Sequence, residues 1–311
     1  MSKTQKSHCK FKASIVGCGS VGSTTAYAYL LSGSVTNMAL IDVNKAKAEG
    51  LMLDLAHATS FTPHTEIEAS DDFKACRGSN IVVITAGARQ EEGETRLDLV
   101  AKNKKIFASI IPKIAKAAPN AILIVVSNPV DVLTYEALKL SGFPENRVIG
   151  SGTVLDSLRL QFHISEKIKI HPSSIDSYVL GEHGDTSFPY FSYANVLGKP
   201  LNDFEGFDDK VAAECYQDTR DAAYRIIHDQ GYTCYSIATV IRELTEAIFE
   251  DQHKVFTLSV KLNDYYGHSE VCLSVPCVLG RNGIEKVIHV PLDEKEQKSL
   301  RKSVKVLKGF L

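Results

Sequence analysis

Three glycines that follow a short apolar run predict a nucleotide-binding turn in the first part of the chain. The apolar residues 11–16 predict a buried strand, and helix-forming residues follow at 23–31. Between them, Gly17 permits a tight turn, Gly19 lets the backbone approach a pyrophosphate, and Gly22 lets the helix pack closely on the strand. The N–H groups in the first turn of such a helix, together with its dipole, favour phosphate. The pattern predicts a dinucleotide-binding fold, with a glycine turn in some other α/β protein as the alternative.

An acidic residue at the end of the next predicted strand indicates which dinucleotide is bound. Residues 38–41 form that strand, and Asp42 follows it, twenty residues after Gly22. A carboxylate at this place accepts hydrogen bonds from the ribose 2′-hydroxyl and repels a 2′-phosphate, so the sequence favours NAD over NADP. The cofactor contacts predicted from this region are Gly17, Gly19, Ser20, Val21, Gly22 and Asp42.

The composition is that of an ordinary soluble globular protein large enough for two domains. The chain has 311 residues, of which 44% are hydrophobic and 23% charged. A formal net charge of −2 argues against nucleic acid or an anionic membrane as the main partner. The apolar runs are too short to span a bilayer, and the basic N-terminus has no apolar signal segment.

The seven cysteines are odd in number and form no CxxC pair. Such a set indicates neither a disulfide framework nor a zinc site. We therefore expect free thiols, a cytoplasmic location and no bound metal.

In the first half of the chain, apolar runs alternate with helical patterns. Residues 81–85 and 121–126 are rich in Val and Ile, whereas 97–118 and 130–140 have helical character. Such runs are strands covered on both faces, which indicates a parallel, doubly wound sheet of the Rossmann type. Right-handed crossovers bring the carboxyl ends of these strands to one edge, where ligands are expected. We assign residues 1–150 to an NAD-binding domain.

The second half predicts a mixture of helices and antiparallel strands. Asn282 and Gly283 form a strong hairpin signal between two predicted strands. We therefore assign residues 151–311 to an α+β substrate domain, closed by an amphipathic helix over 294–307. The other helices predicted here cover 151–168, 208–228 and 235–250, and the strands cover 175–180, 254–262, 271–279 and 286–290.

Four polar segments beside predicted strand ends or glycines supply candidate catalytic groups: residues 85–96, 126–131, 150–159 and 181–185. Each has an ordinary structural alternative, namely a solvated loop, a surface Asp–Arg pair, or a histidine held in a glycine-rich turn. Together they offer a histidine, a carboxylate and two arginines beside a nicotinamide site, which are the groups that reduction of an α-keto acid requires. The cofactor contacts predicted from the strand ends are Thr85, Ala86, Gly87, Ser127 and Asn128.

The chain resembles the L-lactate dehydrogenases of the lactate/malate dehydrogenase family from about Phe11 to Phe310. The stretches that carry the resemblance are GCGSVG, TAGARQEEGETRLDLV, VSNPVDVLTY, RVIGSGTVLDSLR, LGEHGD and LSVPCVLG. The resemblance implies reversible hydride transfer between NADH and pyruvate, giving L-lactate. It also implies a place in glycolysis and fermentation, and a homotetramer or, as the second choice, a dimer.

The resemblance implies a role for each polar residue. His183 would donate and accept the proton, because charge develops on the carbonyl oxygen as hydride adds, and Asp156 would orient it and raise its pKa. Arg159 would bind the substrate carboxylate bidentately. Arg96 would polarise the carbonyl from a closing loop, and Asn128 would lie near that carbonyl.

Gln90, six residues before Arg96, is expected to decide between pyruvate and oxaloacetate. Malate-specific relatives typically have arginine here, which pairs with the second substrate carboxylate. A neutral glutamine leaves that charge unpaired in a closed pocket, at a cost on the order of 3–5 kcal/mol. The resemblance also places Thr233 beside the substrate's side group and Ile237 against the nicotinamide ring. Pyruvate is therefore favoured, with L-malate dehydrogenase or a broader L-2-hydroxy acid dehydrogenase as alternatives.

Two residues differ from those of relatives that fructose bisphosphate activates. Gln161 and Asp176 stand where those bacterial enzymes carry an arginine and a histidine, so we expect no activation by this effector.

Tyr135 and Lys139 match the YxxxK pair of short-chain dehydrogenases. The glycine spacing differs from that superfamily, so we interpret the match as a coincidence on a helix surface. A non-enzymatic NAD-binding protein is the remaining alternative, and the presence of a proton donor argues against it.

Overall fold

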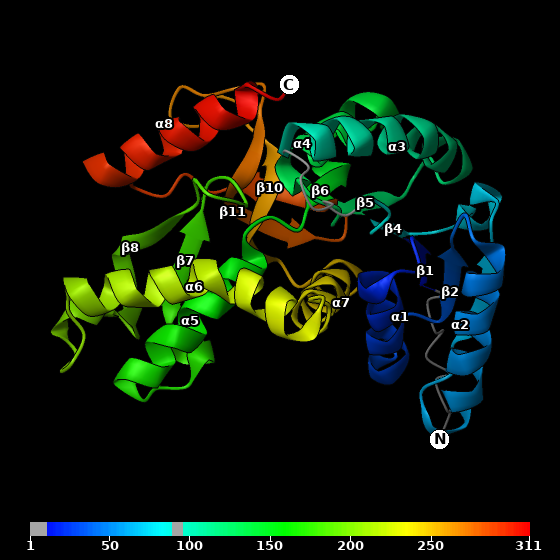
Figure 1. The fold of residues 1–311 in the computed structure, drawn as a ribbon, viewed down its shortest axis with the longest axis horizontal. Coiled ribbons are helices and arrows are strands. Elements are labelled where there is room, and N and C mark those ends of the chain that lie inside the picture. Colours follow the sequence, from blue (N-terminus) through cyan, green and yellow to red (C-terminus); the bar gives the residue numbers. More distant parts are fainter. Residues whose placement is uncertain (1–10, 89–95) are drawn as a thin grey trace, which may run out of the picture.

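In the computed structural model, which describes residues 11–88 and 96–311 apart from the side chain of Arg96, one large sheet runs through the molecule (Figure 1). Within those residues its nine strands follow the order β12-β11-β10-β6-β5-β4-β1-β2-β3. Strands β1 to β6 pair in parallel, whereas β10 is antiparallel to β6, with Ser259 opposite Gly150. The strands are β1 Lys12–Val16, β2 Asn37–Ile41, β3 Glu66–Ser70, β4 Ile81–Ile84, β5 Ile122–Val125, β6 Val148–Gly150, β10 Lys254–Lys261, β11 Cys272–Gly280 and β12 Gly283–Val287.

Helices cover both faces of the parallel part, and its apolar strands are therefore buried on both sides. Ile15 and Leu40 belong to the cluster that includes α1 and α7, whereas Val82 and Ile84 pack with α3 and α4. Figure 1 shows these two pairs of helices on opposite sides of the sheet. The helices are α1 Ser20–Ser32, α2 Lys45–Ala58, α3 Arg96–Ala117, α4 Val130–Ser141, α5 Val154–Ile168, α6 Asp209–Gln230, α7 Tyr235–Phe249 and α8 Glu294–Lys308, with short 3₁₀ helices at Thr59–Phe61, Phe73–Cys76, Glu145–Arg147, Pro172–Ser174 and Leu201–Asp203.

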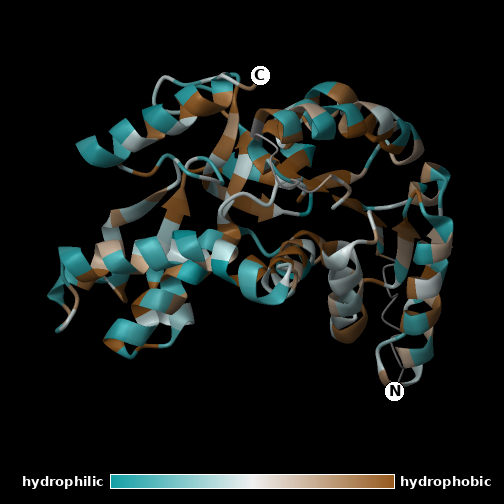
Figure 2. Cartoon of the chain, in the orientation of Figure 1, coloured by the Kyte–Doolittle hydropathy of each residue, from teal (hydrophilic) through white to brown (hydrophobic). Residues whose placement is uncertain are grey.

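A smaller antiparallel sheet lies in the second half of the chain. It consists of β7 Asp176–Leu180, β8 Phe188–Val196 and β9 Lys199–Pro200. Leu160 and Ile164 of α5 pack on it beside Val179. Figure 2 shows α6 and α8 as mainly hydrophilic helices, in contrast to the hydrophobic central strands. No helix within residues 11–88 and 96–311 has the length and apolar character needed to cross a bilayer.

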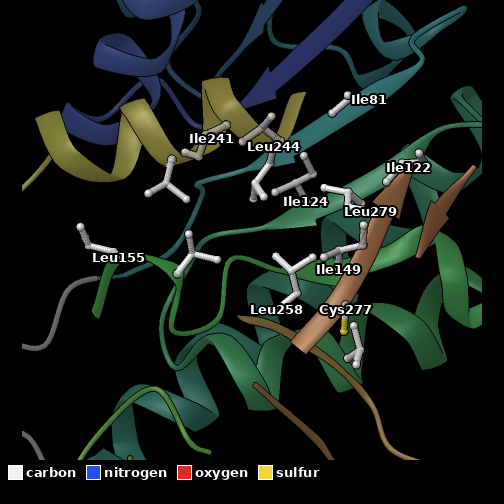
Figure 3. Close-up of a cluster of buried hydrophobic side chains, with 14 of the residues drawn as sticks. Ile81, Ile122, Ile124, Ile149, Leu155, Ile241, Leu244, Leu258, Cys277 and Leu279 are labelled. Carbon is white, nitrogen blue, oxygen red and sulfur yellow. The ribbon is translucent and has the colours of Figure 1, made fainter. Parts of the chain in front are cut away.

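One hydrophobic cluster joins the two halves of the chain (Figure 3). Ile124 of β5 and Ile149 of β6 lie in the same cluster as Leu258 of β10 and Ile241 and Leu244 of α7. Burial of each such side chain contributes about 1.5–3 kcal/mol. The cluster therefore fixes the second half against the parallel sheet. The segment that follows β7 then lies at the edge of that sheet.

The predicted fold class is confirmed, with a doubly wound parallel sheet followed by an α+β half that contains antiparallel strands. Several boundaries were wrong by three residues. Helix α5 begins at Val154 rather than at residue 151, and β12 ends at Val287 rather than at residue 290. Helix α1 begins at Ser20 rather than at residue 23, because Gly19 is already its N-cap. Strand β12 begins at Gly283 rather than at residue 286, because a two-residue turn already pairs Gly283 with Gly280. The helix α2, the strands β3, β8 and β9, and the short 3₁₀ helices were not predicted.

Candidate functional site

In the glycine loop before α1, two glycines have no room for a Cβ atom, and one faces open space. Gly17 has φ +104°, and a Cβ there would lie 2.6 Å from the Ala86 nitrogen, while a Cβ on Gly22 would lie 1.9 Å from the Gly17 oxygen. A Cβ on Gly19 would meet no described atom within 4 Å. A ligand's phosphates can therefore approach the backbone at Gly19, at the positive end of α1.

Asp42 lies at the end of β2 with its carboxylate fixed beside this loop. One oxygen accepts the Cys18 N–H at 2.7 Å, and the other accepts the Asn44 N–H at 2.9 Å. The carboxylate predicted to contact the ribose is therefore held in one orientation at the end of β2. Burial raises the pKa of the Cys18 thiol to about 11, so this cysteine in the glycine loop is protonated and unreactive at neutral pH.

Hydrogen bonds also fix the ends of β4 and β5. Thr85 Oγ1 donates to the Gly17 oxygen at 2.7 Å, and Ser127 Oγ donates to the Ala86 oxygen at 2.6 Å.

Asn103 of α3 is fully buried, accepts the Ala88 N–H at 2.7 Å and donates to the Asn128 oxygen at 2.7 Å. Asn103 therefore connects the two strand ends. We did not predict Asn103 from the sequence. The sign that could have revealed it is a polar residue on the apolar face of a predicted helix.

Asp156 of α5 contacts both of the basic residues predicted to surround a substrate. Its Oδ2 lies 2.6 Å from Nδ1 of His183, and its Oδ1 accepts from Nη1 of Arg159 at 3.1 Å. The side chains of Asp156, Arg159 and His183 are 15%, 12% and 26% exposed, so their interactions are only weakly screened by water. The imidazole is thus positioned by a carboxylate that is itself held by a guanidinium.

The charges of this group shift two pKa values in opposite directions. Burial by itself would raise the pKa of Asp156, but His183 and Arg159 bring it below its usual range. Burial would lower the pKa of His183, but Asp156 and then Asp131 raise it above its usual range. A carboxylate that stays ionised and an imidazole that binds a proton readily suit a proton donor.

The loop that carries His183 is anchored from several elements. Gly181 exchanges two backbone hydrogen bonds with Ser274 of β11, at 2.9 and 3.0 Å. The His183 N–H donates to Oδ2 of Asp131 at 2.7 Å. Ser303 of α8 donates to the Thr186 oxygen at 2.6 Å. Packed elements thus fix the position of the imidazole, although it lies on a loop.

A cavity of about 970 Å³ extends from the glycine loop to Asp156, Arg159 and His183. Its volume falls in the range of cofactor sites, and residues from α6, among them Tyr216 and Arg220, form part of its wall. These α6 residues were not predicted, since nothing in the sequence shows which helix lies across the cleft. The predicted site residues that line the cavity are Gly19, Ser20, Val21, Gly22, Thr85, Gly87, Ser127, Asn128, Asp156, Arg159, His183 and Thr233.

The other predicted residues fall into two groups: some do not line the cavity, and the rest lie outside the described residues. Gly17, Asp42 and Ala86 lie beside it, in or against the glycine loop. Ile237 of α7 is partly buried against the main core. Gln90 and the side chain of Arg96 lie outside the described residues. Tyr135 and Lys139 lie together on α4, where Tyr135 donates to Glu270 at 3.4 Å, and neither lines the cavity.

Comparisons with known proteins agree with this geometry. Residues 11–150 match the NAD binding domain of lactate/malate dehydrogenase, and residues 153–311 match the family's alpha/beta C-terminal domain. The chain is 45% identical to L-lactate dehydrogenases from Acetivibrio thermocellus and from Clostridium botulinum strain Okra, with 96% of each chain covered in both comparisons.

Solved structures are similar over the same length. A lactate dehydrogenase from a Medee basin deep-sea metagenome library has a TM-score of 0.94 at 39% identity, with 97% of this chain and 98% of that chain covered. The minor L-lactate dehydrogenase of Enterococcus mundtii has a TM-score of 0.93 at 34% identity, with 97% of each chain covered. The chain therefore belongs to the lactate/malate dehydrogenase family.

Proposed function

We propose that this protein is an NAD-dependent L-lactate dehydrogenase, which transfers hydride reversibly between NADH and pyruvate to give L-lactate. The observation that carries the proposal is the Arg159–Asp156–His183 group on the wall of the cavity that begins at the glycine loop. Relatives named L-lactate dehydrogenase, at 45% identity over 96% of the chain, support the choice of reaction.

The residues of the cleft fit a nicotinamide dinucleotide. The loop is open to phosphate at Gly19, Asp42 is fixed beside it, and Ser127 and Asn128 line the cavity beyond it. NADH, when bound, supplies the hydride that reduces the keto carbon. The protein's own part is to bind the keto acid, exclude water and move one proton.

Each basic residue has a separate task in this mechanism. Arg159 uses one N–H to hold Asp156, and the other donors of its fork remain suited to a substrate carboxylate. His183 gives its proton to the keto oxygen as negative charge develops there, and Asp156 stabilises the imidazolium before transfer. We assign carbonyl polarisation to Arg96 and a further contact with that carbonyl to Asn128.

Gln90 is proposed to set the preference for pyruvate over oxaloacetate. An uncharged amide offers no partner to a second substrate carboxylate, which costs on the order of 3–5 kcal/mol in a closed site. Thr233 lines the cavity and is proposed to border the methyl group of pyruvate. Ile237 is proposed to contact the nicotinamide ring.

We infer a cytoplasmic enzyme of glycolysis and fermentation that assembles as a homotetramer. We also propose a division into an NAD-binding domain, residues 1–150, and a substrate domain, residues 151–311.

Initial rates test the function directly. The loss of NADH absorbance is followed with pyruvate, oxaloacetate, 2-oxobutyrate and phenylpyruvate in parallel, each with NADH and with NADPH. We expect the highest kcat/KM with pyruvate and NADH. A higher value with oxaloacetate would favour a malate dehydrogenase, and no turnover with any keto acid would favour a non-enzymatic NAD-binding protein.

A further inference from the structure

Asp131 is a buried carboxylate that contacts the proton donor without facing the substrate. It lies in the first turn of α4, its side chain does not line the cavity, and it is 1% exposed. Its Oδ2 accepts the backbone N–H of His183 at 2.7 Å, and its Oδ1 accepts from Oγ of Ser259 at 2.6 Å. Asp131 therefore connects the parallel half, the His183 loop and β10.

A neutral side chain would hold these two groups at a lower cost than a carboxylate. Desolvation of a charge is expensive, and it is offset here by an N–H, an O–H and the positive end of α4. An ionised Asp131 acts on His183 in the same direction as Asp156, because both negative charges favour a proton on the imidazole. The charge thus has an electrostatic effect that hydrogen bonding alone would not require.

We propose that Asp131 is a positioning residue for the reaction: its carboxylate fixes the backbone of His183 and, as a second negative charge beside Asp156, favours the imidazolium that donates the proton. This inference depends on the proposed role of His183.

The groups around this pair define the pH range in which the effect operates. Burial raises the pKa of Asp131 to about 6, although Ser259 and the His183 amide lower it, so the carboxylate is mainly ionised at neutral pH. Glu182, in the same loop, is the other nearby acid, and Arg159 is the nearby cation that opposes protonation of His183. Burial raises the pKa of the neighbouring Cys272 thiol on β11, so that group is neutral.

The charge is tested with Asp131→Asn, which has nearly the same shape. The introduced amide can accept from the His183 N–H and donate to Ser259, whose hydroxyl rotates to accept. The geometry is then kept while the charge is lost. In the pH profile of kcat/KM for pyruvate reduction, the pKa of the alkaline limb should fall by roughly one unit, about a tenfold loss of rate above that limb. An unshifted pKa would overturn the electrostatic role.

The hydrogen bond is tested with Asp131→Ala, which leaves the His183 N–H without this acceptor. The charge is lost as well, so the alkaline pKa should fall as in Asp131→Asn. Below that limb we expect kcat/KM to fall on the order of 10–100-fold, with the dissociation constant for NADH, measured by fluorescence, unchanged within about twofold. Wild-type kcat/KM in this variant would overturn the positioning role.

Ser259→Ala is the matched control, because it removes one hydrogen bond and keeps the charge. It should lower kcat/KM by about two- to fivefold. Because Ser259 lowers the pKa of Asp131, its loss should weaken the charge only in part, so the alkaline pKa should fall by much less than in Asp131→Asn. A fall as large as in Asp131→Asn would contradict the electrostatic role. If neither Asp131 variant folds, wild-type kcat/KM in Ser259→Ala would overturn the positioning role, since this variant removes one of the two hydrogen bonds that hold Asp131. Wild-type enzyme is measured in parallel: its failure to reduce pyruvate rejects the proposed function, whereas an active wild type with unshifted variants rejects only the role of Asp131.

Discussion

Nδ1 of His183 lies 2.6 Å from Oδ2 of Asp156, so Nε2 is the ring nitrogen left for a substrate. The carboxylate holds the tautomer in which Nδ1 keeps its proton, and the proton on Nε2 is the one that can be transferred. The same contact raises the pKa of His183, which links the orientation of the ring to its protonation. Two predictions about activity depend on this pair.

Replacement of the proton donor should separate binding from chemistry. His183→Asn keeps a polar group that can face Asp156 but cannot carry the proton. We expect kcat for pyruvate reduction to fall by about three to four orders of magnitude, while NADH still binds. Steady-state rates and NADH fluorescence titration measure the two effects, and retained turnover would remove His183 from the mechanism.

Asp156→Asn should shift the pH dependence in a defined direction. Pyruvate reduction needs protonated His183, so its rate is present below the histidine pKa and is lost as pH rises through it, whereas lactate oxidation follows the opposite course. The variant loses the charge that raises this pKa, so both limbs should move to lower pH. Rates in both directions between pH 5 and pH 9 test this, and limbs that move to higher pH would contradict it.

Gln90→Arg should change the choice of substrate. The introduced cation can pair with the second carboxylate of oxaloacetate, so the ratio of kcat/KM for oxaloacetate to that for pyruvate should rise by about two to four decades. Gln90→Leu is the control, because it changes shape without adding charge and should leave oxaloacetate a poor substrate. An unchanged ratio in Gln90→Arg would show that another residue sets specificity.

Two glycines of the loop should respond differently to alanine. Gly19 has φ −73° and open space where a Cβ would point, so Gly19→Ala should keep the melting temperature but weaken NADH binding on the order of tenfold. Gly22→Ala places a Cβ 1.9 Å from the Gly17 oxygen and should destabilise the fold by about 1–3 kcal/mol. Thermal melts and NADH titrations compare them. Undiminished NADH binding by Gly19→Ala would show that phosphate does not approach there.

Fructose bisphosphate should leave the KM for pyruvate unchanged. Gln161 already donates its amide to the Ser177 oxygen at 3.1 Å, and Asp176 is an exposed acid, so this pair offers no cation to a phosphate. Rates with and without the effector at low pyruvate concentration provide the test, and a large fall in KM would contradict the prediction.

Local patterns in the sequence predicted most of the parallel half. The Val and Ile runs of β4 and β5 and the spacing of Gly17, Gly19 and Gly22 depend on neighbours within a few residues, so they can be recognised directly. Strand β3 was missed because its sequence, EIEAS, is polar and lies at the sheet edge. Strand β8 was missed because its nine residues alternate poorly between buried and exposed.

The supporting contacts of the site depend on residues far apart in the chain. Asn103 connects Ala88 and Asn128, and Asp131 reaches Ser259 across 128 positions. No periodicity or motif records such a pair. His183, Asp156 and Arg159 were candidates because they lie in polar segments beside predicted strand ends or glycines, and family resemblance supplied their roles. The structure brings those three side chains together.

Strand β6 pairs on its outer side with β10, through Ser259 and Gly150, although β10 lies more than a hundred positions later in the chain. On the ribosome, the parallel half therefore emerges with an unpaired edge whose N–H and C=O groups can capture another polypeptide. That interval ends only once β10 has left the exit tunnel, so we expect the growing chain to be most prone to aggregation between the synthesis of β6 and that of β10.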